Sequence, residues 1–425
     1  MLTLKLICES KDEVLKRLAI KNFNAIELVD KVLTLDDQRR LIQGKLDANL
    51  AEQNSLSKGI GILFKQGKAS EANEFKVKVT ELKEESKQLS LKMAEVEQEL
   101  NLTLIRIPNL PHQSVPAGVS AEDNLEIRSG GIVPVLPENA KPHWELGKMF
   151  DIIDFELGVK ITGAGFPVYK GKGAKMQRAL INFFLDENIN AGYREIMPPL
   201  MVNEDSAYGT GQLPDKDGQM YHVQTDNFYL IPTAEVPVTN IYKDVILNTS
   251  DFPIKLTAYT PCFRREAGSY GKDVRGLNRL HQFDKVEIVQ VQHPDRSYDS
   301  LDEMVNHVEN LLKKLELPYR ILRLCGGDMS FTSALTYDFE VFSAAQKMWL
   351  EVSSVSNFES FQANRLMLRF REEGEKRNQL AHTLNGSALA LPRILAALLE
   401  NNQVEGAIRI PKVLQPYCGF DIIDI

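Results

Sequence analysis

The sequence is poor in the features that mark secreted, zinc-stabilised or membrane-spanning proteins. It holds four cysteines in 425 residues, and none stands in a CxxC or Cys/His spacing typical of a metal site. We therefore expect free thiols in a reducing compartment and no structural zinc. No apolar run approaches the length of a membrane span. The first residues, MLTLKLICESKDEV, reach charged side chains too early for a signal peptide.

Basic charge is also in short supply. The net charge is −8, which argues against a protein that coats DNA, although it allows a local basic patch. The apolar fraction of 43% and the charged fraction of 25% are those of an ordinary globular protein. These values predict a cytoplasmic protein without a membrane or DNA partner, long enough for two or three domains.

Two heptad series occupy the first hundred residues, with apolar side chains spaced alternately four and three apart. The first is Leu28, Val32, Leu35, Arg39, Ile42, Leu46, Asn49, Gln53 and Leu56. The second is Phe75, Val79, Leu82, Ser86, Leu89, Met93, Val96 and Leu100. A glycine-containing stretch, KGIGILFKQGKA, separates them. The pattern predicts two antiparallel helices of about 30 residues, each roughly 45 Å long.

Such a helical hairpin has two interpretations that the heptads leave open. It is either a coiled coil that joins two chains or an arm that projects toward RNA. Its tip is mildly basic, since Lys58, Lys65, Lys68, Lys76 and Lys78 are accompanied there by Glu71 and Glu74. Lysines at such a tip could contact phosphates.

A stretch rich in proline and small residues, IRIPNLPHQSVPAGVSAEDN, follows the second series and resembles an interdomain linker. We place the boundary within 105–116, which gives domains 1–105 and 106–425. The second domain mixes helical and strand patterns. One helix is expected at about 174–187, followed by the strand REIMPPLMV with its two prolines, and another helix at 295–317. The glycines of KGKGAK lack the spacing of a phosphate-binding loop.

The stretch from Cys262 to Glu287 is predicted to form two strands joined by a polar loop over 267–278. Side chains alternate along a strand. Arg264 and Glu266 should therefore share one face of the first strand. On the second strand, Arg279, Phe283 and Glu287 should share a face, with Val286 and Ile288 opposite. The charged face is either a solvated surface with ion pairs or one wall of a binding site.

Other polar residues stand at the ends of expected elements. Thr233 and Glu235 either point into one pocket or begin a helix, because threonine before acidic residues is also capping chemistry. Glu351, Ser353 and Ser354 lie on the expected strand MWLEVSSVSN. Arg393 stands near the start of a helix, where an anion is favoured.

These residues carry a resemblance to a known class of enzymes. The stretch at about 260–289 closely resembles motif 2 of class II aminoacyl-tRNA synthetases, and Arg264, Glu266, Arg279, Phe283 and Glu287 fill its positions. The stretch at about 383–400, NGSALALPR with Gly386 and Arg393, resembles motif 3, although Ala388 and Pro392 depart from it. The helix and proline-bearing strand at about 173–202 resemble motif 1. TAE, HTLNGS, IPNLPH, HWELG and the helical hairpin are similar to seryl-tRNA synthetases of the bacterial type.

The resemblance implies a fold and a reaction. The fold would be α+β, an antiparallel-sheet class II catalytic domain preceded by a long antiparallel α-helical coiled-coil arm that binds tRNA. The reaction would be the ATP-dependent attachment of L-serine to tRNA through seryl-adenylate, releasing pyrophosphate and AMP. The partners would be serine tRNA, selenocysteine tRNA where the organism has one, and a second copy of the chain docked through motif 1.

The resemblance also implies roles for individual residues. Arg264 would bridge the serine carboxylate and the α-phosphate, and Arg393 would hold the γ-phosphate. The ATP-binding residues would be Arg264, Arg265, Glu266, Leu280, Phe283, Glu351, Val352, Ser353, Ser354 and Arg393. The serine-binding residues would be Thr233, Ala234, Glu235, Arg264, Glu287 and Ser387. Glu351 and Ser354 would hold Mg²⁺ with ATP. Strict alternation places them on opposite faces, so either a bulge is needed or Ser354 contributes in another way.

Two other interpretations compete with this one. One is a different class II synthetase, such as a prolyl or threonyl enzyme, which usually carries an anticodon-binding domain after motif 3. The other is a non-catalytic relative or a coiled-coil scaffold, against which Arg264, Glu266, Glu287 and Arg393 all count. We expect the loop at 267–278 to sense the tRNA acceptor end.

Overall fold

The computed structural model describes residues 1–215, 218–266 and 275–424. By its internal contacts the chain divides into two units. One consists of Met1–Ala19 and Phe23–Pro108, and the other of Ile20–Asn22 and Asn109–Ile425. No helix in the described residues is both long enough and apolar enough to cross a membrane. The four cysteines are free thiols.

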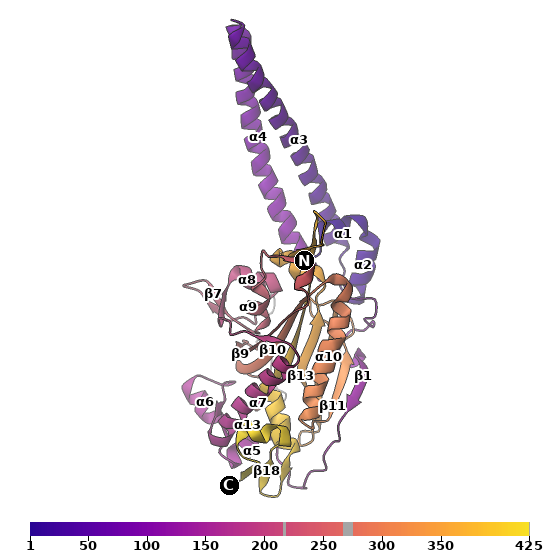
Figure 1. Cartoon of the computed structure of the whole chain (residues 1–425), viewed down its shortest axis with the longest axis vertical. Helices are drawn as coiled ribbons and strands as arrows, with labels where there is room; N and C mark the ends of the chain where they lie inside the picture. Colours follow the sequence, from indigo (N-terminus) through magenta and orange to yellow (C-terminus); the bar gives the residue numbers. More distant parts are fainter. Residues whose placement is uncertain (216–217, 267–274, 425) are drawn as a thin grey trace. The chain divides into compact units, whose positions relative to one another are not determined.

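The first unit is helical. Its elements are α1 (Leu4–Glu9), α2 (Lys11–Ile20), α3 (Ile26–Lys65) and α4 (Ala69–Leu104). Helices α3 and α4 run side by side in opposite directions (Figure 1). The predicted heptad positions form their contact, since Val32, Ile42, Val79 and Leu82 are all at most 8% exposed. The predicted antiparallel helical hairpin is therefore confirmed.

The helices are longer than the predicted length of about 30 residues, because α3 continues through the first part of the glycine-containing stretch and ends at Lys65. Helix α3 has 40 residues, or roughly 60 Å at 1.5 Å per residue. Gly59 lies inside it at a close approach, where a Cβ would stand 2.9 Å from the Phe75 ring. The chain turns instead at Gly67, whose φ of +75° suits glycine. The predicted break KGIGILFKQGKA therefore contains the turn, but at 66–68 rather than at its first two glycines.

The second unit is built on an eight-stranded sheet with the order β1-β11-β12-β13-β16-β10-β9-β4. Its strands are β1 (Leu125–Gly130), β4 (Arg194–Glu195), β9 (Ile254–Phe263), β10 (Gln282–Gln292), β11 (Tyr319–Arg323), β12 (Leu335–Ser343), β13 (Met348–Asn357) and β16 (His382–Ala390). Neighbours pair antiparallel except β4 with β9, which are parallel. The predicted antiparallel-sheet domain is confirmed.

Helices cover one face of this sheet. The described helices of the unit are α5 (His143–Met149), α6 (Phe155–Ile161), α7 (Gly171–Asn190), α8 (Glu204–Thr210), α9 (Glu235–Asn240), α10 (Ser297–Lys314), α11 (Ser360–Leu366), α12 (Leu391–Asn401) and α13 (Gln415–Cys418). Helices α7, α10 and α12 pack on the sheet through one apolar core that includes Phe183, Met304, Leu395 and Phe339, and α10 lies along the strands in Figure 1. On the other face, α9 packs against β10 and α11 against β16, so that face is only partly open to a site.

Short strands form the remaining sheets. They are β2 (Ile153–Asp154) with β3 (Val168–Tyr169); β5 (Met201–Asn203), β6 (His222–Val223) and β7 (Phe228–Leu230); β8 (Ile246–Asn248), β14 (Arg369–Arg371) and β15 (Asn378–Leu380); and β17 (Gln403–Val404), β18 (Ala407–Arg409) and β19 (Ile422–Asp424). The proline-bearing strand of the sequence is divided between β4 and β5, since proline cannot donate to a ladder.

The proline-rich stretch is not a loose spacer along its whole length. Asn109 is 3% exposed, and its amide nitrogen donates to the carbonyls of Thr332 and Phe358 at 2.9 and 2.8 Å. The backbone N–H of His112 donates to the Ala334 carbonyl at 2.7 Å. From Asn109 onward, therefore, this stretch is part of the sheet unit.

Candidate active site

A cavity of about 520 Å³ opens beside the sheet. It collects residues that the sequence places far apart, including Thr233, Glu235, Arg264, Glu266, Leu280, Phe283, Glu287, Glu351, Val352, Ser353, Ser354, Ser387 and Arg393. Most of the predicted site residues therefore line a single space.

Strand β10 supplies the floor of this cavity. Phe283, Lys285 and Glu287 line it, while Val286 and Ile288 are fully buried in the core beneath. This alternation confirms the predicted two-faced strand. Lys285 was missed, although its place between Phe283 and Glu287 in the period-two pattern was the signal that could have found it.

The predicted hairpin is shorter than expected at its loop end. Strand β9 stops at Phe263, which pairs with Gln282 on β10. Arg264, Glu266 and Arg279 therefore lie outside the strands, and the prediction that alternation places them was wrong. Glu266 has a φ of +47°, which no strand allows. Its carboxylate nevertheless pairs with the Arg279 guanidinium at 3.0 Å.

Arg264 is held where its guanidinium faces the cavity. Its Cζ lies 5.3 Å from the centroid of the Phe283 ring, a stacking distance for a cation on an aromatic face. Its Nε donates to the Pro232 carbonyl at 3.3 Å. This contact uses one of the five N–H donors and leaves the outer edge of the guanidinium for an anion.

A buried cluster of polar groups surrounds Glu287 at one end of the cavity. Its carboxylate is 2.5 Å from Nζ of Lys285, and it accepts hydrogen bonds from the Thr233 hydroxyl at 3.0 Å and the Asn385 amide at 3.3 Å. Ser387 lies opposite Glu287 in the β10–β16 ladder. A small polar molecule that enters here meets both charges and hydroxyl groups.

Glu235 stands beside this cluster at the start of α9. Its carboxylate accepts from Gln362 at 2.6 Å, and Gln362 in turn accepts from the Thr383 hydroxyl at 2.7 Å. Burial, and then the Glu287 carboxylate, raises the pKa of Glu235 to about 7. The capping alternative also holds in part, because the Thr233 hydroxyl accepts from the Glu235 backbone N–H at 3.2 Å.

Two predicted site residues do not present side chains to the cavity. Ala234 is fully buried and packs in a small apolar cluster with Val238 and Leu256. Arg265 is absent from the residues that line the cavity, and its backbone N–H donates to the Gln219 carbonyl at 2.9 Å. Each lies next to a residue that lines the cavity, but its own side chain does not line it. The order of residues in the sequence does not reveal this direction.

Strand β13 contains a bulge, the first of the two alternatives for Glu351 and Ser354. Glu340 of β12 pairs with Glu351, whereas Phe339 pairs with Ser353, so Val352 is an extra residue. The bulge brings Glu351 and Ser354 into the lining of the same cavity. The Ser353 hydroxyl donates to the Ser387 carbonyl at 2.5 Å, which ties this strand to β16.

Arg393 lines the cavity from the first turn of α12. Its Nε donates to the Asn278 carbonyl at 3.0 Å, and its Nη1 donates to the Glu351 carbonyl at 2.7 Å. The Glu351 carboxylate is 3.8 Å from the same guanidinium. Asn278, a second lining residue that the sequence interpretation missed, lies in the loop that was noted only as polar.

Glu351 and Ser354 also border a second cavity of about 560 Å³, with Asp338 and Glu340 in its lining. Burial, and then the Glu351 carboxylate, raises the pKa of Asp338 well above its usual range. In the described residues, no group of three or more His, Cys, Asp or Glu side chains is arranged to hold a metal ion. Of the loop at 267–278, where the acceptor end was expected, residues 267–274 lie outside the described residues.

Two family models match the chain. The tRNA synthetase class II core domain (G, H, P, S and T) matches residues 221–402, which include the cavity. The seryl-tRNA synthetase N-terminal domain matches residues 1–111, which include the helical hairpin.

Whole proteins match as well. A serine–tRNA ligase of Salinibacter ruber is 50% identical over 421 residues, covering 99% of this chain and 98% of that protein. One of Geobacter sulfurreducens is 45% identical, covering 99% of both.

Solved structures agree with these relatives. The seryl-tRNA synthetase of Pyrococcus horikoshii complexed with ATP has a TM-score of 0.93 at 33% identity, covering 100% of this chain and 99% of that one. A prolyl-tRNA synthetase of Giardia lamblia reaches only 0.56 at 14% identity over 64% of this chain and 54% of its own, a likeness of fold alone. The motifs, the sheet and the two matching domains together place this chain in the seryl-tRNA synthetase family of class II aminoacyl-tRNA synthetases.

Proposed function

We propose that this protein attaches L-serine to tRNA in two steps, using ATP. The observation that carries the proposal is one cavity that Arg264 lines together with two groups of polar side chains. Glu287, Lys285 and Thr233 are bonded to one another, and Glu351 is paired with Arg393. The relatives are serine–tRNA ligases, and structural neighbours hold ATP or AMP.

In the first step the serine carboxylate attacks the α-phosphate of ATP. A bond forms from the carboxylate oxygen to the α-phosphorus, the bond from that phosphorus to the α,β-bridging oxygen breaks, and pyrophosphate leaves. The protein needs no nucleophile for this reaction; it must bring two anions together and neutralise the developing charge. Arg264 is suited to this work because a guanidinium binds oxyanions through paired donors.

The part of the cavity that Phe283, Glu351 and Arg393 line suits the nucleotide. Phe283 offers a ring face to adenine once Arg264 turns toward the phosphates, and the Glu266 carboxylate can accept from its amino group. We assign Arg393 to the γ-phosphate, and its position close to the start of α12, where an anion is favoured, supports this assignment.

Glu351 and Ser354 fit a Mg²⁺ ion bound together with ATP. Both contribute oxygen to the same cavity, and Mg²⁺ usually takes only one or two protein oxygens beside phosphate oxygens and water. Bound there, the ion would neutralise charge on the phosphates. The protein's own part is to hold these two side chains on one face through the bulge at Val352.

The polar cluster around Glu287 suits serine and gives a basis for selectivity. We assign Glu287 and Ser387 to the serine hydroxyl, and Thr233 with Glu235 to its ammonium group. A buried site built to bond a hydroxyl rejects alanine or glycine by as much as roughly 10⁴-fold, because its polar groups would otherwise go unpaired.

In the second step the seryl group moves from the adenylate to the terminal ribose of tRNA, and AMP leaves. We propose that the helical hairpin binds the tRNA by its shape and backbone. Its tip is less basic than the sequence implies, because Lys68 pairs with Glu71 at 3.1 Å and Lys78 with Glu52 at 2.7 Å. We further propose that the enzyme works in the cytoplasm as a homodimer. We also propose that it accepts selenocysteine tRNA, which charging assays with serine tRNA and selenocysteine tRNA would test.

The substitution Glu287→Ala tests the proposal. We expect it to abolish serine-dependent ATP–pyrophosphate exchange, because Lys285 and Thr233 lose their partner, while ATP binding stays measurable by calorimetry. The assay should include threonine, alanine and proline, which separates this function from that of another class II synthetase.

Glu309→Ala is the matched control for that variant. Glu309 is also buried, at 6% exposed, and pairs with Arg128 at 2.7 Å, but it lies on α10 and does not line the cavity. We expect serine-dependent exchange to persist in this control. Unchanged exchange in Glu287→Ala would refute the serine assignment, and absence of exchange in the unaltered protein would support a non-catalytic relative.

A further inference from the structure

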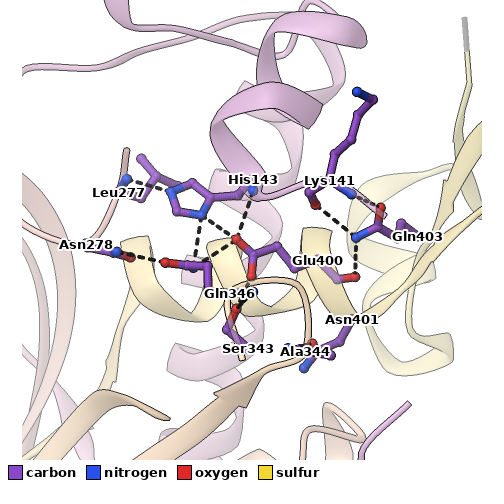
Figure 2. Close-up of polar contacts among 10 residues, drawn as sticks. All are labelled: Lys141, His143, Leu277, Asn278, Ser343, Ala344, Gln346, Glu400, Asn401 and Gln403. Atoms are coloured by element: carbon purple, nitrogen blue, oxygen red, sulfur yellow. Dashed lines mark hydrogen bonds and ion pairs between the residues drawn. The ribbon is translucent and has the colours of Figure 1, made fainter. Parts of the chain in front are cut away.

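A fully buried polar network lies next to the part of the cavity assigned to ATP without lining it. His143, the first residue of α5, and Glu400, near the end of α12, are both 0% exposed, and Nδ1 of the imidazole is 2.7 Å from Oε1 of the carboxylate. Figure 2 shows them at the centre of the network. Polar groups are buried at a free-energy cost unless they are hydrogen-bonded, and both of these side chains are bonded to several partners.

The hydrogen bonds determine which tautomer His143 adopts. Its Nε2 accepts from the backbone N–H of Leu277 at 2.8 Å, and a backbone N–H can only donate. The proton is therefore on Nδ1, which donates to Glu400. The same carboxylate also accepts from the backbone N–H of His143 at 2.8 Å, from the Gln346 amide at 2.9 Å and from the Ser343 hydroxyl.

His143 and Trp144 contact three consecutive residues, 275–277, in the segment that precedes β10. The Arg275 guanidinium lies 4.8 Å from the Trp144 ring centroid. Gly276 has a φ of +68°, and a Cβ there would collide with Nε2 of His143. Leu277 donates to that same nitrogen. The segment is thus held by a cation–π contact, a close approach that requires glycine, and a hydrogen bond.

The next residue connects the network to the site. The Asn278 amide nitrogen donates to Gln346 at 3.0 Å, and Gln346 is bonded to Glu400 (Figure 2). The Asn278 carbonyl accepts from Nε of Arg393 at 3.0 Å. Arg393 and Glu400 are on one side of α12, since they lie two helical turns apart. Both ends of this helix are therefore tied to residues 277 and 278.

We infer that His143 and Glu400 are positioning residues for ATP. They hold Leu277 and Asn278 so that the Asn278 carbonyl keeps the Arg393 guanidinium directed into the cavity. Neither side chain touches a substrate. The inference rests on the proposed function in giving Arg393 the γ-phosphate.

Two amide substitutions at His143 test this role. In His143→Gln the side-chain oxygen reaches the place of Nε2 and accepts from Leu277. In His143→Asn the shorter side chain reaches only the place of Nδ1, so it still donates to Glu400 but leaves the Leu277 N–H unpaired. We expect the Kd and KM for ATP to rise about tenfold in His143→Asn and His143→Ala, and much less in His143→Gln. Glu400→Gln, which places an amide N–H among donors, should behave as His143→Ala does.

The measurements are calorimetric ATP binding and pyrophosphate exchange per active site, with the KM for serine recorded alongside. The serine KM should stay within about twofold, because the Glu287 end has no bond to the network. His307→Ala is the matched control. This half-buried histidine bonds to Asn188 at 2.6 Å on the helical face of the sheet, and its loss should leave ATP affinity unchanged.

The inference is overturned if the asparagine and glutamine variants bind ATP equally, or if the KM values for ATP and serine rise together. Either result would mean that His143 only supports folding. Calorimetry also separates this inference from the proposed function. A protein that binds ATP but shows no serine-dependent exchange refutes the proposed function, while the asparagine–glutamine difference still decides the role of His143.

Discussion

Glu235 is a carboxylate held where water barely reaches it, at 6% exposed. Burial and the Glu287 charge both favour its neutral form, whereas the Gln362 hydrogen bond and the positive charges of Lys285 and Arg264 oppose them. The net effect raises its pKa to about 7. Its charge is therefore poised to change near neutral pH, and an ammonium group in the cavity would favour the ionised form.

This environment predicts a pH-dependent stability difference between the unaltered protein and Glu235→Gln. The folded state holds the proton more tightly than the unfolded state, whose pKa is near 4.5. Stability therefore falls as pH rises between these two values. We expect the free energy of unfolding of the unaltered protein to fall relative to Glu235→Gln by as much as about 3 kcal/mol from pH 4.5 to pH 8. Urea unfolding at several pH values measures this difference.

The same titration should appear in serine use. Because an ionised Glu235 attracts the ammonium group, the serine KM should fall as pH rises from 6 to 8, and this slope should vanish in Glu235→Gln. The Glu309→Ala protein, with its altered carboxylate outside the cavity, should keep the slope. Identical pH profiles for Glu235→Gln and the unaltered protein would refute the assignment of Glu235 to the ammonium end.

At the scale of elements, helices α3 and α4 of the hairpin pack against each other along one seam. This seam is mostly apolar, but Gln53 is buried within it and donates to the Leu82 carbonyl and the Ser86 hydroxyl at 3.1 and 2.8 Å. A paired polar group at one position of a coiled coil helps to specify register. The distal part carries no residue of the cavity, so its removal should separate two functions.

Deleting 56–76 and joining the helices by a short turn should lower tRNA charging at least about tenfold, because phosphate contacts of the arm are lost. Serine-dependent pyrophosphate exchange should be unchanged. Replacing Lys58 and Lys65 by serine in the full-length arm is the matched control, which separates loss of charge from loss of length. An equal loss of charging and exchange would mean that the arm has a structural role instead.

For the whole molecule, exposed apolar side chains gather in the region that resembles motif 1. Met197 is 90% exposed, Met201 49% and Leu200 38%. Contiguous apolar exposure of this kind is typical of an interaction surface. It supports the proposal that two copies of the chain dock through motif 1.

Met197→Glu should therefore shift the protein from dimer to monomer, because a carboxylate would be buried without a partner in the interface. Sedimentation velocity at several concentrations measures the change. Leu91→Glu alters an equally apolar side chain, 55% exposed on α4, and should leave the dimer intact. A monomeric unaltered protein would contradict the proposal.

Several parts of the site follow from local pattern. Phe283 and Glu287 face one way because side chains alternate along any strand, and the seam of α3 and α4 follows from heptad spacing. A bulge was one of two alternatives for Glu351 and Ser354, since they are an odd number of residues apart. Its place at Val352 depends on how β13 pairs with β12, which no local pattern specifies.

The sequence by itself determined the periodic elements, the charged strand and the family, because spacing and residue chemistry are local properties of a chain. Only the tertiary structure decided that Asn278 lines the cavity, that Ala234 does not, and that His143 meets Leu277. Those relations join residues more than a hundred positions apart in some cases, as with His143 and Leu277. They depend on packing between elements, which the order of residues along the chain does not display.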